Sequence, residues 1–78
     1  MLFDVERATR AGLPAIVVRG ELDIATAPAF AEVAAGALAA GPASLVVDLT
    51  ATTFLDSSGA RQVVRLVRQA QAGGAAVQ

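Results

Sequence analysis

Apolar and polar residues at the start of the chain follow the short period of β-strands. Residues 2–7 alternate loosely between the two kinds, as in a half-buried strand, and residues 15–22 are mostly β-branched and apolar. Between them, residues 11–14 (Ala-Gly-Leu-Pro) have the composition of a turn, with Gly12 and Pro14 outside the strand interiors. We therefore expect a β-hairpin whose first strand lies at the edge of a sheet.

The next segment has a helical period. Five apolar residues recur at the spacing of one buried helical face: Phe30, Val33, Ala34, Ala37 and Leu38. Thr26 is the predicted N-cap through its hydroxyl, Pro28 lies just inside the helix, and Gly41-Pro42 end it. Gly36 disfavours a helix by about 1 kcal/mol relative to Ala, so we expect close packing against a neighbour there.

A second apolar run and a second helical pattern follow. Residues 45–50 are nearly continuously apolar, which is typical of a central strand covered on both faces. Asp48 interrupts that run, so we expect it to be paired or near the strand end, without a catalytic role. A second helix is expected from the Asp-Ser-Ser-Gly segment 56–59, capped by Ser or Asp, to Gly73-Gly74. The residues predicted to form the buried face of this helix are Ala60, Val63, Val64, Val67 and Ala70.

The order strand, strand, helix, strand, helix and an incipient strand at 75–78 predicts one α/β domain over residues 1–78. The strand–helix–strand unit favours parallel pairing, because about 98% of such crossovers are right-handed. The expected fold is thus a mixed β-sheet with an N-terminal hairpin and parallel βαβ units. Phe30 and Phe54 are expected in its core.

Composition excludes several kinds of chemistry. The 78 residues contain no Cys, no His and no Lys, because all 6 basic residues are Arg. There is therefore no thiol or imidazole for catalysis, no His or Cys metal site, and no lysine for a phosphate-binding loop or Schiff base. A net charge of −1 and the lack of Trp and Tyr argue against nucleic-acid binding. We expect a protein without cofactor or metal.

Targeting signals are not evident in this sequence. Residues 1–10 mix acidic and basic side chains, unlike a signal peptide. The longest uncharged stretch, 33–47, is shorter than the ~18 residues that span a bilayer. We expect a cytoplasmic domain that does not insert into a membrane.

Candidate chemistry gathers where the two parallel strands are predicted to end. The loops at 20–26 and 53–59 leave the same edge of the sheet and form the usual ligand crevice of such folds. Polar side chains from both loops should meet there: Asp23, Thr26, Asp56, Ser57 and Ser58. The second loop also opens a helix, whose N-terminus favours an anion. A phosphoserine at that position would be stabilised by the helix yet lie near two carboxylates.

Three segments together carry a family resemblance: Gly20-Glu21-Leu22-Asp23, Val47-Asp48-Leu49-Thr50 and Phe54-Leu55-Asp56-Ser57-Ser58-Gly59. They resemble the STAS domain of bacterial anti-sigma factor antagonists. The resemblance implies a small α/β protein that binds an anti-sigma factor with serine kinase activity and thereby releases a sigma factor. Phosphorylation of a serine in the Asp-Ser-Ser-Gly segment then breaks the complex, and a phosphoserine phosphatase restores it.

Carried over by motif, the phosphorylated residue is Ser58. The partner-binding residues implied are Asp23, Thr26, Asp56, Ser57, Ser58, Gly59 and Arg61. The pair Ala60-Arg61 departs from the small or apolar pair common in the family, and it places an Arg within one turn of the acceptor. Arg61 could hold a phosphate or dock an acidic partner surface, and both readings stay open.

The family's domain is usually longer, with a fourth strand, a further helix and often a fifth strand. We therefore expect residues 1–78 to be a STAS domain truncated at the C-terminus. If the chain ends at Gln78, its last strand lies at an uncovered sheet edge, which favours a homodimer through that edge.

Simpler interpretations compete with this one. The serines can act as helix caps alone, Asp23 as a turn residue, and Arg61, Arg65 and Arg68 as a solvated helix face. A second function is a STAS accessory subunit of a transporter or stress-signalling complex. A third makes Ser57 or Ser58 a nucleophile with Asp23 or Asp56 as its base, but a carboxylate activates serine poorly without an imidazole. We expect a binding module and not an enzyme.

Overall fold

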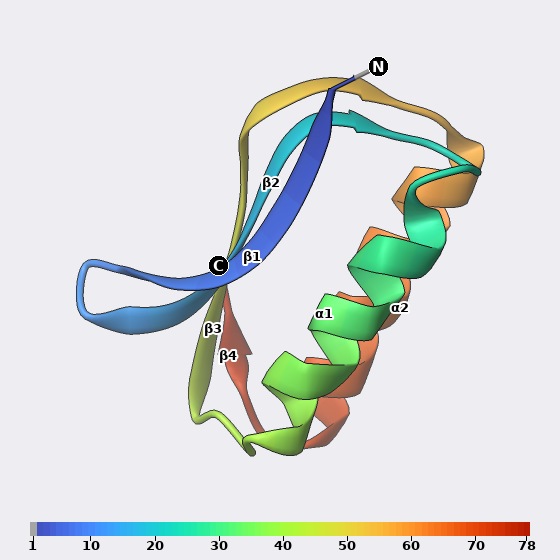
Figure 1. Cartoon of the computed structure of the whole chain (residues 1–78). Helices are drawn as coiled ribbons and strands as arrows, with labels where there is room; N and C mark the ends of the chain where they lie inside the picture. The colour runs from blue at the N-terminus through green and yellow to red at the C-terminus, as the bar shows by residue number, and fades with distance from the viewer. Residues whose placement is uncertain (1) are drawn as a thin grey trace.

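The computed structural model describes residues 2–78 as one sheet with two helices (Figure 1). The elements in chain order are β1 (Phe3–Arg10), β2 (Leu13–Leu22), α1 (Ala27–Ala39), β3 (Ser44–Leu55), α2 (Ser57–Ala72) and β4 (Ala76–Val77). The sheet order is β1-β2-β3-β4, with β1 antiparallel to β2 and the other two pairs parallel. This confirms the predicted mixed α/β fold. No helix in the described part of the chain is long and apolar enough to cross a bilayer.

The predicted hairpin is confirmed, with a shorter turn. Ala11 and Gly12 alone connect the strands, at φ +52° and +76°. Positive φ at both positions matches a type I′ turn, whose twist fits that of the flanking strands. Pro14 lies within β2, so its placement outside the strand was wrong. Its missing amide is tolerated because the ladder with β3 begins only at Ala15.

Both helices lie on the same face of the sheet (Figure 1). The prediction that residues 45–50 are covered on both faces is therefore wrong. Along β2, Ile16 and Val18 belong to the core beneath the helices, whereas the alternate residue Val17 pairs with Glu6 and Asp48 on the opposite, helix-free face. Val17 is nevertheless only 2% exposed. Polar side chains must therefore cover that face.

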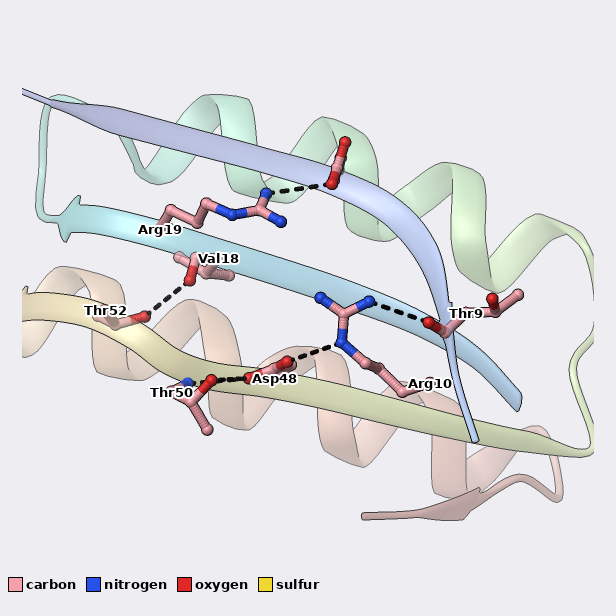
Figure 2. Close-up of polar contacts among 8 residues, drawn as sticks. Thr9, Arg10, Val18, Arg19, Asp48, Thr50 and Thr52 are labelled. Carbon is pink, nitrogen blue, oxygen red and sulfur yellow. Dashed lines mark hydrogen bonds and ion pairs between the residues drawn. The ribbon is translucent and has the colours of Figure 1, made fainter. Parts of the chain in front are cut away.

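Two charged clusters lie on this helix-free face (Figure 2). The Arg10 side chain reaches across to Asp48, with Nε 3.0 Å from Oδ2, and Asp48 Oδ1 accepts hydrogen bonds from the Thr50 hydroxyl at 2.6 Å and the Thr50 amide at 2.9 Å. These contacts, those of Thr50 first and Arg10 next, lower the pKa of Asp48 to about 2. Asp48 is thus paired, as predicted.

Arg19 forms the second cluster. Its guanidinium lies 3.1 Å from both Asp4 and Glu6 of β1. The hydrogen bond to Glu6 is the main reason why the pKa of Arg19 is raised. The aliphatic part of such side chains covers apolar surface while the charge stays in water, which explains the burial of Val17.

The core between sheet and helices is small and dominated by six fully buried side chains: Phe30, Ile16, Leu22, Leu45, Leu66 and Val18. Phe30 is in the core as predicted. Phe54 is 52% exposed and Val64 48% exposed, so their assignment to the core was wrong. The buried residues of α2 are Gly59, Leu66 and Ala70, with Val63 packed beside them.

Gly59 explains why the buried face of α2 differs from the predicted one. A Cβ at Gly59 would overlap the carbonyl oxygen of Leu22, so the first turn of α2 lies directly against the end of β2. That contact rotates the helix so that Gly59, Leu66 and Ala70, at i, i+7 and i+11, face the core. Val64 then points toward solvent.

Two expectations about α1 were also wrong. Thr26 occupies the N-cap position but makes no side-chain capping bond. Gly36 is not required by close packing, because the only atom that a Cβ there would approach within 4 Å is Arg7 Nη1, at 3.7 Å. The helix does end before Gly41-Pro42, as predicted.

Candidate functional site

The candidate site lies where β2 and β3 end side by side. Leu22 and Leu55 form the last residue pair between the parallel strands β2 and β3, and the chain changes direction after each of them. Residues 23–26 lead from β2 into α1, and Asp56 alone leads from β3 into α2. The two connections are shorter than the predicted loops, because residues 20–22 belong to β2 and β3 continues past residue 50 to Leu55.

Asp56 joins the two connections. Its Oδ1 accepts a hydrogen bond from the Gly59 amide at 2.8 Å, which caps α2, and its Oδ2 accepts from the Ile24 amide at 3.2 Å. Its own amide donates to the Leu22 carbonyl at 3.3 Å. The carboxylate of Asp56 is therefore the N-cap of α2 and also fixes the turn that leaves β2.

Ser57 and Ser58 are the first two residues of α2, immediately after that cap. Ser57 is exposed and Ser58 half-buried. Within residues 2–78 neither hydroxyl takes part in a hydrogen bond, because Asp56 already satisfies the capping requirement. Both residues also belong to the first turn, where backbone amides have no partner inside the helix and the helix dipole is positive. Capping therefore does not account for the two serines.

Asp23 and Thr26 form a closed local network. Asp23 Oδ1 accepts hydrogen bonds from the amides of Ala25 and Thr26 at 2.9 and 3.1 Å. The Thr26 hydroxyl donates to the Glu21 carbonyl at 2.8 Å and accepts from the Asp23 amide at 2.9 Å. Asp23 thus acts as the turn residue of the simpler interpretation. Its Oδ2 has no hydrogen-bond partner among the residues that the structure describes, so this oxygen is open to another molecule.

The structure brings only part of the predicted set into contact. Asp56 bonds to the turn of Asp23 and Thr26 through the Ile24 amide. No hydrogen bond links the side chains of Asp23 or Thr26 to those of Ser57 or Ser58 in the described chain. Gly59 has a structural role, because the close approach to Leu22 excludes a side chain. Arg61 is exposed one turn into α2.

Exposed apolar side chains surround the site, which the sequence interpretation missed. The large exposed apolar residues of the described chain are Leu2, Ile24, Phe54, Leu55 and Val64. All but Val64 lie at this end of the sheet, since the Leu2 carbonyl accepts from the Glu21 amide and Glu21 pairs with Phe54. Ile24 is 75% exposed although it lies in the middle of the site turn. Such clustering is typical of a surface that contacts another protein.

A metal centre is not formed by this arrangement. The described residues include no group of three acidic, His or Cys side chains placed to hold an ion. The site instead contains the free hydroxyls of Ser57 and Ser58, one free carboxylate oxygen of Asp23 and the positive end of helix α2. Exposed apolar side chains surround these groups.

The comparisons with known proteins agree with this geometry. The family model of the STAS domain matches residues 4–77. The chain belongs to the STAS domain family. The match extends over both connections of the site and over all four strands except Phe3.

Solved structures resemble this STAS domain closely. An anti-sigma factor antagonist from Mycobacterium paratuberculosis has a TM-score of 0.79 and 30% sequence identity over 86% of this chain. The STAS domain of an antisigma-factor antagonist from Rhodobacter sphaeroides has a TM-score of 0.75 and 22% identity over 97% of this chain, and supports the fold alone. The anti-sigma factor antagonist SpoIIAA, a Bacillus cell fate determinant, matches in its unphosphorylated and phosphorylated forms with TM-scores of 0.69 and 0.68, at 25% identity over 97% of this chain.

The STAS domain described here is shorter than these proteins. It covers 57% of the mycobacterial chain, 83% of the Rhodobacter chain, and 69% and 68% of the two SpoIIAA chains. A search among curated protein sequences finds no significant match.

Proposed function

We propose that this STAS domain acts as an anti-sigma factor antagonist. In this proposal it binds an anti-sigma factor with serine kinase activity in the cytoplasm, and so releases a sigma factor. The binding surface is formed by the turn at residues 23–26, the first turn of α2 and the surrounding apolar side chains. The similarity to solved anti-sigma factor antagonists supports this role.

One structural observation carries the proposal. Asp56 caps α2, and the hydroxyls of Ser57 and Ser58 have no hydrogen-bond partner within residues 2–78. A residue that only terminated the helix would use its hydroxyl for that purpose. Two adjacent serines with unused hydroxyls, on a helix end that favours anions, are suited to receive a phosphoryl group.

Ser58 is the proposed acceptor. The partner kinase would transfer the γ-phosphoryl group of ATP to Ser58 Oγ, with loss of the hydroxyl proton and release of ADP. The phosphate brings about −1.5 to −2 charges. It would lie close to Asp56 and next to an apolar contact surface, where an added charge must be desolvated on binding. The complex would therefore dissociate, and a phosphoserine phosphatase would restore binding by hydrolysing the ester.

The experiment is to incubate the purified domain with its anti-sigma factor and ATP and to map phosphate by mass spectrometry. One phosphate on Ser58 is expected, and the Ser58→Ala variant should remain unmodified while the matched Ser57→Ala variant is phosphorylated normally. Phosphate on another residue, or none in the presence of an anti-sigma factor that binds, would refute the assignment. Recovery of a transporter or a stress-signalling complex as the stable partner would instead support an accessory role.

A further inference from the structure

The charges of the chain are segregated between α2 and the rest. Helix α2 contains Arg61, Arg65 and Arg68 and no acidic residue. Because the whole chain has a formal net charge of −1, and α2 contributes +3, all other residues together carry −4. Separation of this kind creates a local positive potential on a protein that is acidic overall.

The three arginines of α2 differ from Arg10 and Arg19 of the sheet. Arg10 and Arg19 form ion pairs on the helix-free face of the sheet. In residues 2–78 the three arginines of α2 form no ion pair, and all three are exposed. Their spacing of i, i+4 and i+7 places them along one side of the helix. We call this side the basic face of α2.

A shallow hollow of about 560 Å³ lies on this face, lined by Ala60, Arg61, Val64, Arg65, Arg68 and Gln69. Val64, at its centre along the helix, is 48% exposed although it is β-branched and apolar. The face therefore combines unpaired positive charge with a small apolar depression. It begins at Arg61, one turn from the serines of the candidate site, and so continues the surface proposed to bind the anti-sigma factor.

We propose that the basic face of α2 docks an acidic, amphipathic segment of the anti-sigma factor. Carboxylates of that segment pair with the arginines, and an apolar side chain of the segment fills the hollow over Ala60 and Val64. This inference rests on the proposed function and adds the chemistry of the partner. Complementary charges at the rim of an interface mainly raise the rate of association and select the correct partner.

The same face connects docking to the phosphorylation of Ser58. Residues three positions apart on a helix are neighbours, so a phosphate on Ser58 lies within reach of Arg61. An intramolecular phosphate would then compete with the partner's carboxylates for that guanidinium. Phosphorylation would thus weaken docking by occupying the first arginine of the face as well as by repelling the partner.

The test measures association with the purified anti-sigma factor for the variants Arg65→Glu and Arg68→Glu and for the two combined. Both side chains are exposed and unpaired, so we expect unchanged thermal unfolding. The double variant should bind about tenfold more weakly at low salt, mainly through slower association. At about 1 M salt, where the Debye length is about 3 Å, its deficit should shrink to less than about threefold.

Arg7→Glu is the matched control for the single variants, because the substitution changes the charge by the same amount. Arg7 is exposed on β1 and has no ion pair in the described chain. It should bind within about twofold of the wild type. Two results would overturn the docking proposal and leave the proposed function intact. The first is that the α2 arginine variants bind the anti-sigma factor as tightly as the wild type does. The second is that Arg7→Glu loses as much affinity as they do. Failure of any anti-sigma factor to bind the wild-type domain would overturn both.

Discussion

The helix-free face of the sheet and the end where β2 and β3 stop are both rich in polar groups, but they differ in how those groups are satisfied. On the helix-free face, Asp48 bonds to Arg10 and Thr50, and Arg19 bonds to two carboxylates. At the end of the strands, the hydroxyls of Ser57 and Ser58 are unused in the described chain. The bonded groups of the helix-free face stabilise the fold, whereas the two serine hydroxyls are free to react or to bind another molecule.

The apolar residues of the two regions show the same contrast. Val17 is almost completely buried on the helix-free face, whereas Ile24 and Phe54 are mostly exposed at the strand ends. A region that leaves two serine hydroxyls and several large apolar side chains without partners is the better candidate for a protein contact. This comparison can be tested by perturbing each region separately.

The largest effect on stability is expected for Gly59→Ala. The new methyl group would overlap the Leu22 carbonyl, so α2 must move away from the end of β2. We expect a loss of about 2 to 3 kcal/mol in the free energy of unfolding, measured by urea denaturation. Gly36→Ala is the matched control, because there is room for its methyl group, and it should stabilise the domain by about 0.5 to 1 kcal/mol. Equal stability of the two variants would show that α2 is not packed against β2 as described.

Removal of the Asp56 carboxylate should have a smaller effect. Asp56→Ala loses the cap of α2 and the bond to the Ile24 amide, which should cost about 1 to 2 kcal/mol of stability. Ser57→Ala should change the free energy of unfolding by less than about 0.5 kcal/mol, because its hydroxyl bonds to nothing in the described chain. A larger loss for Ser57→Ala than for Asp56→Ala would assign the cap to the serine and remove the main argument for a free hydroxyl.

The smallest expected effect is on the stability of the domain in acid, and it arises from Asp48 on the helix-free face. Asp48 has a pKa of about 2 in the folded chain and an ordinary value of 3.8. Its contribution to stability is therefore complete above about pH 4 and is lost as the pH falls toward 2. Thr50→Val removes the largest cause of the lowered pKa, so the free energy of unfolding should depend less steeply on pH between 4 and 2 than in the wild type.

Thr53→Val is the control for that titration, since Thr53 is an exposed threonine on the same strand without a side-chain hydrogen bond in the described residues. It should follow the wild-type curve, and binding of the anti-sigma factor at neutral pH should be unaffected in both variants. A steeper curve for Thr50→Val would contradict the account of Asp48.

The local periodicity of the sequence predicted the elements and their order, because each element carries its own pattern and end signals. It failed where the outcome depends on contacts between elements. Phe54 was placed in the core because the periodicity points inward at that position, whereas β3 continues to Leu55 past two irregularities in its pairing with β2 and leaves Phe54 exposed. Leu66 was missed because two overlapping apolar faces of α2 fit the helical period, and only the contact of Gly59 with Leu22 selects the face that is buried.

For the candidate site, the motif predicted which residues gather but not what each one does. Asp, Ser and Gly are all acceptable at a helix start, so the sequence could not decide whether Asp56 or a serine caps α2. The exposure of Ile24 depends on a four-residue turn held by Asp23 and Asp56, and it has no signal in the sequence alone.

In the proposed function, a phosphate on Ser58 ends the interaction with the anti-sigma factor. The most direct measurement compares the dissociation constant of the domain phosphorylated on Ser58 with that of the same sample after phosphatase treatment, by calorimetry against one purified anti-sigma factor. The account predicts binding at least about tenfold weaker for the phosphorylated form. Equal dissociation constants for the two forms would contradict it.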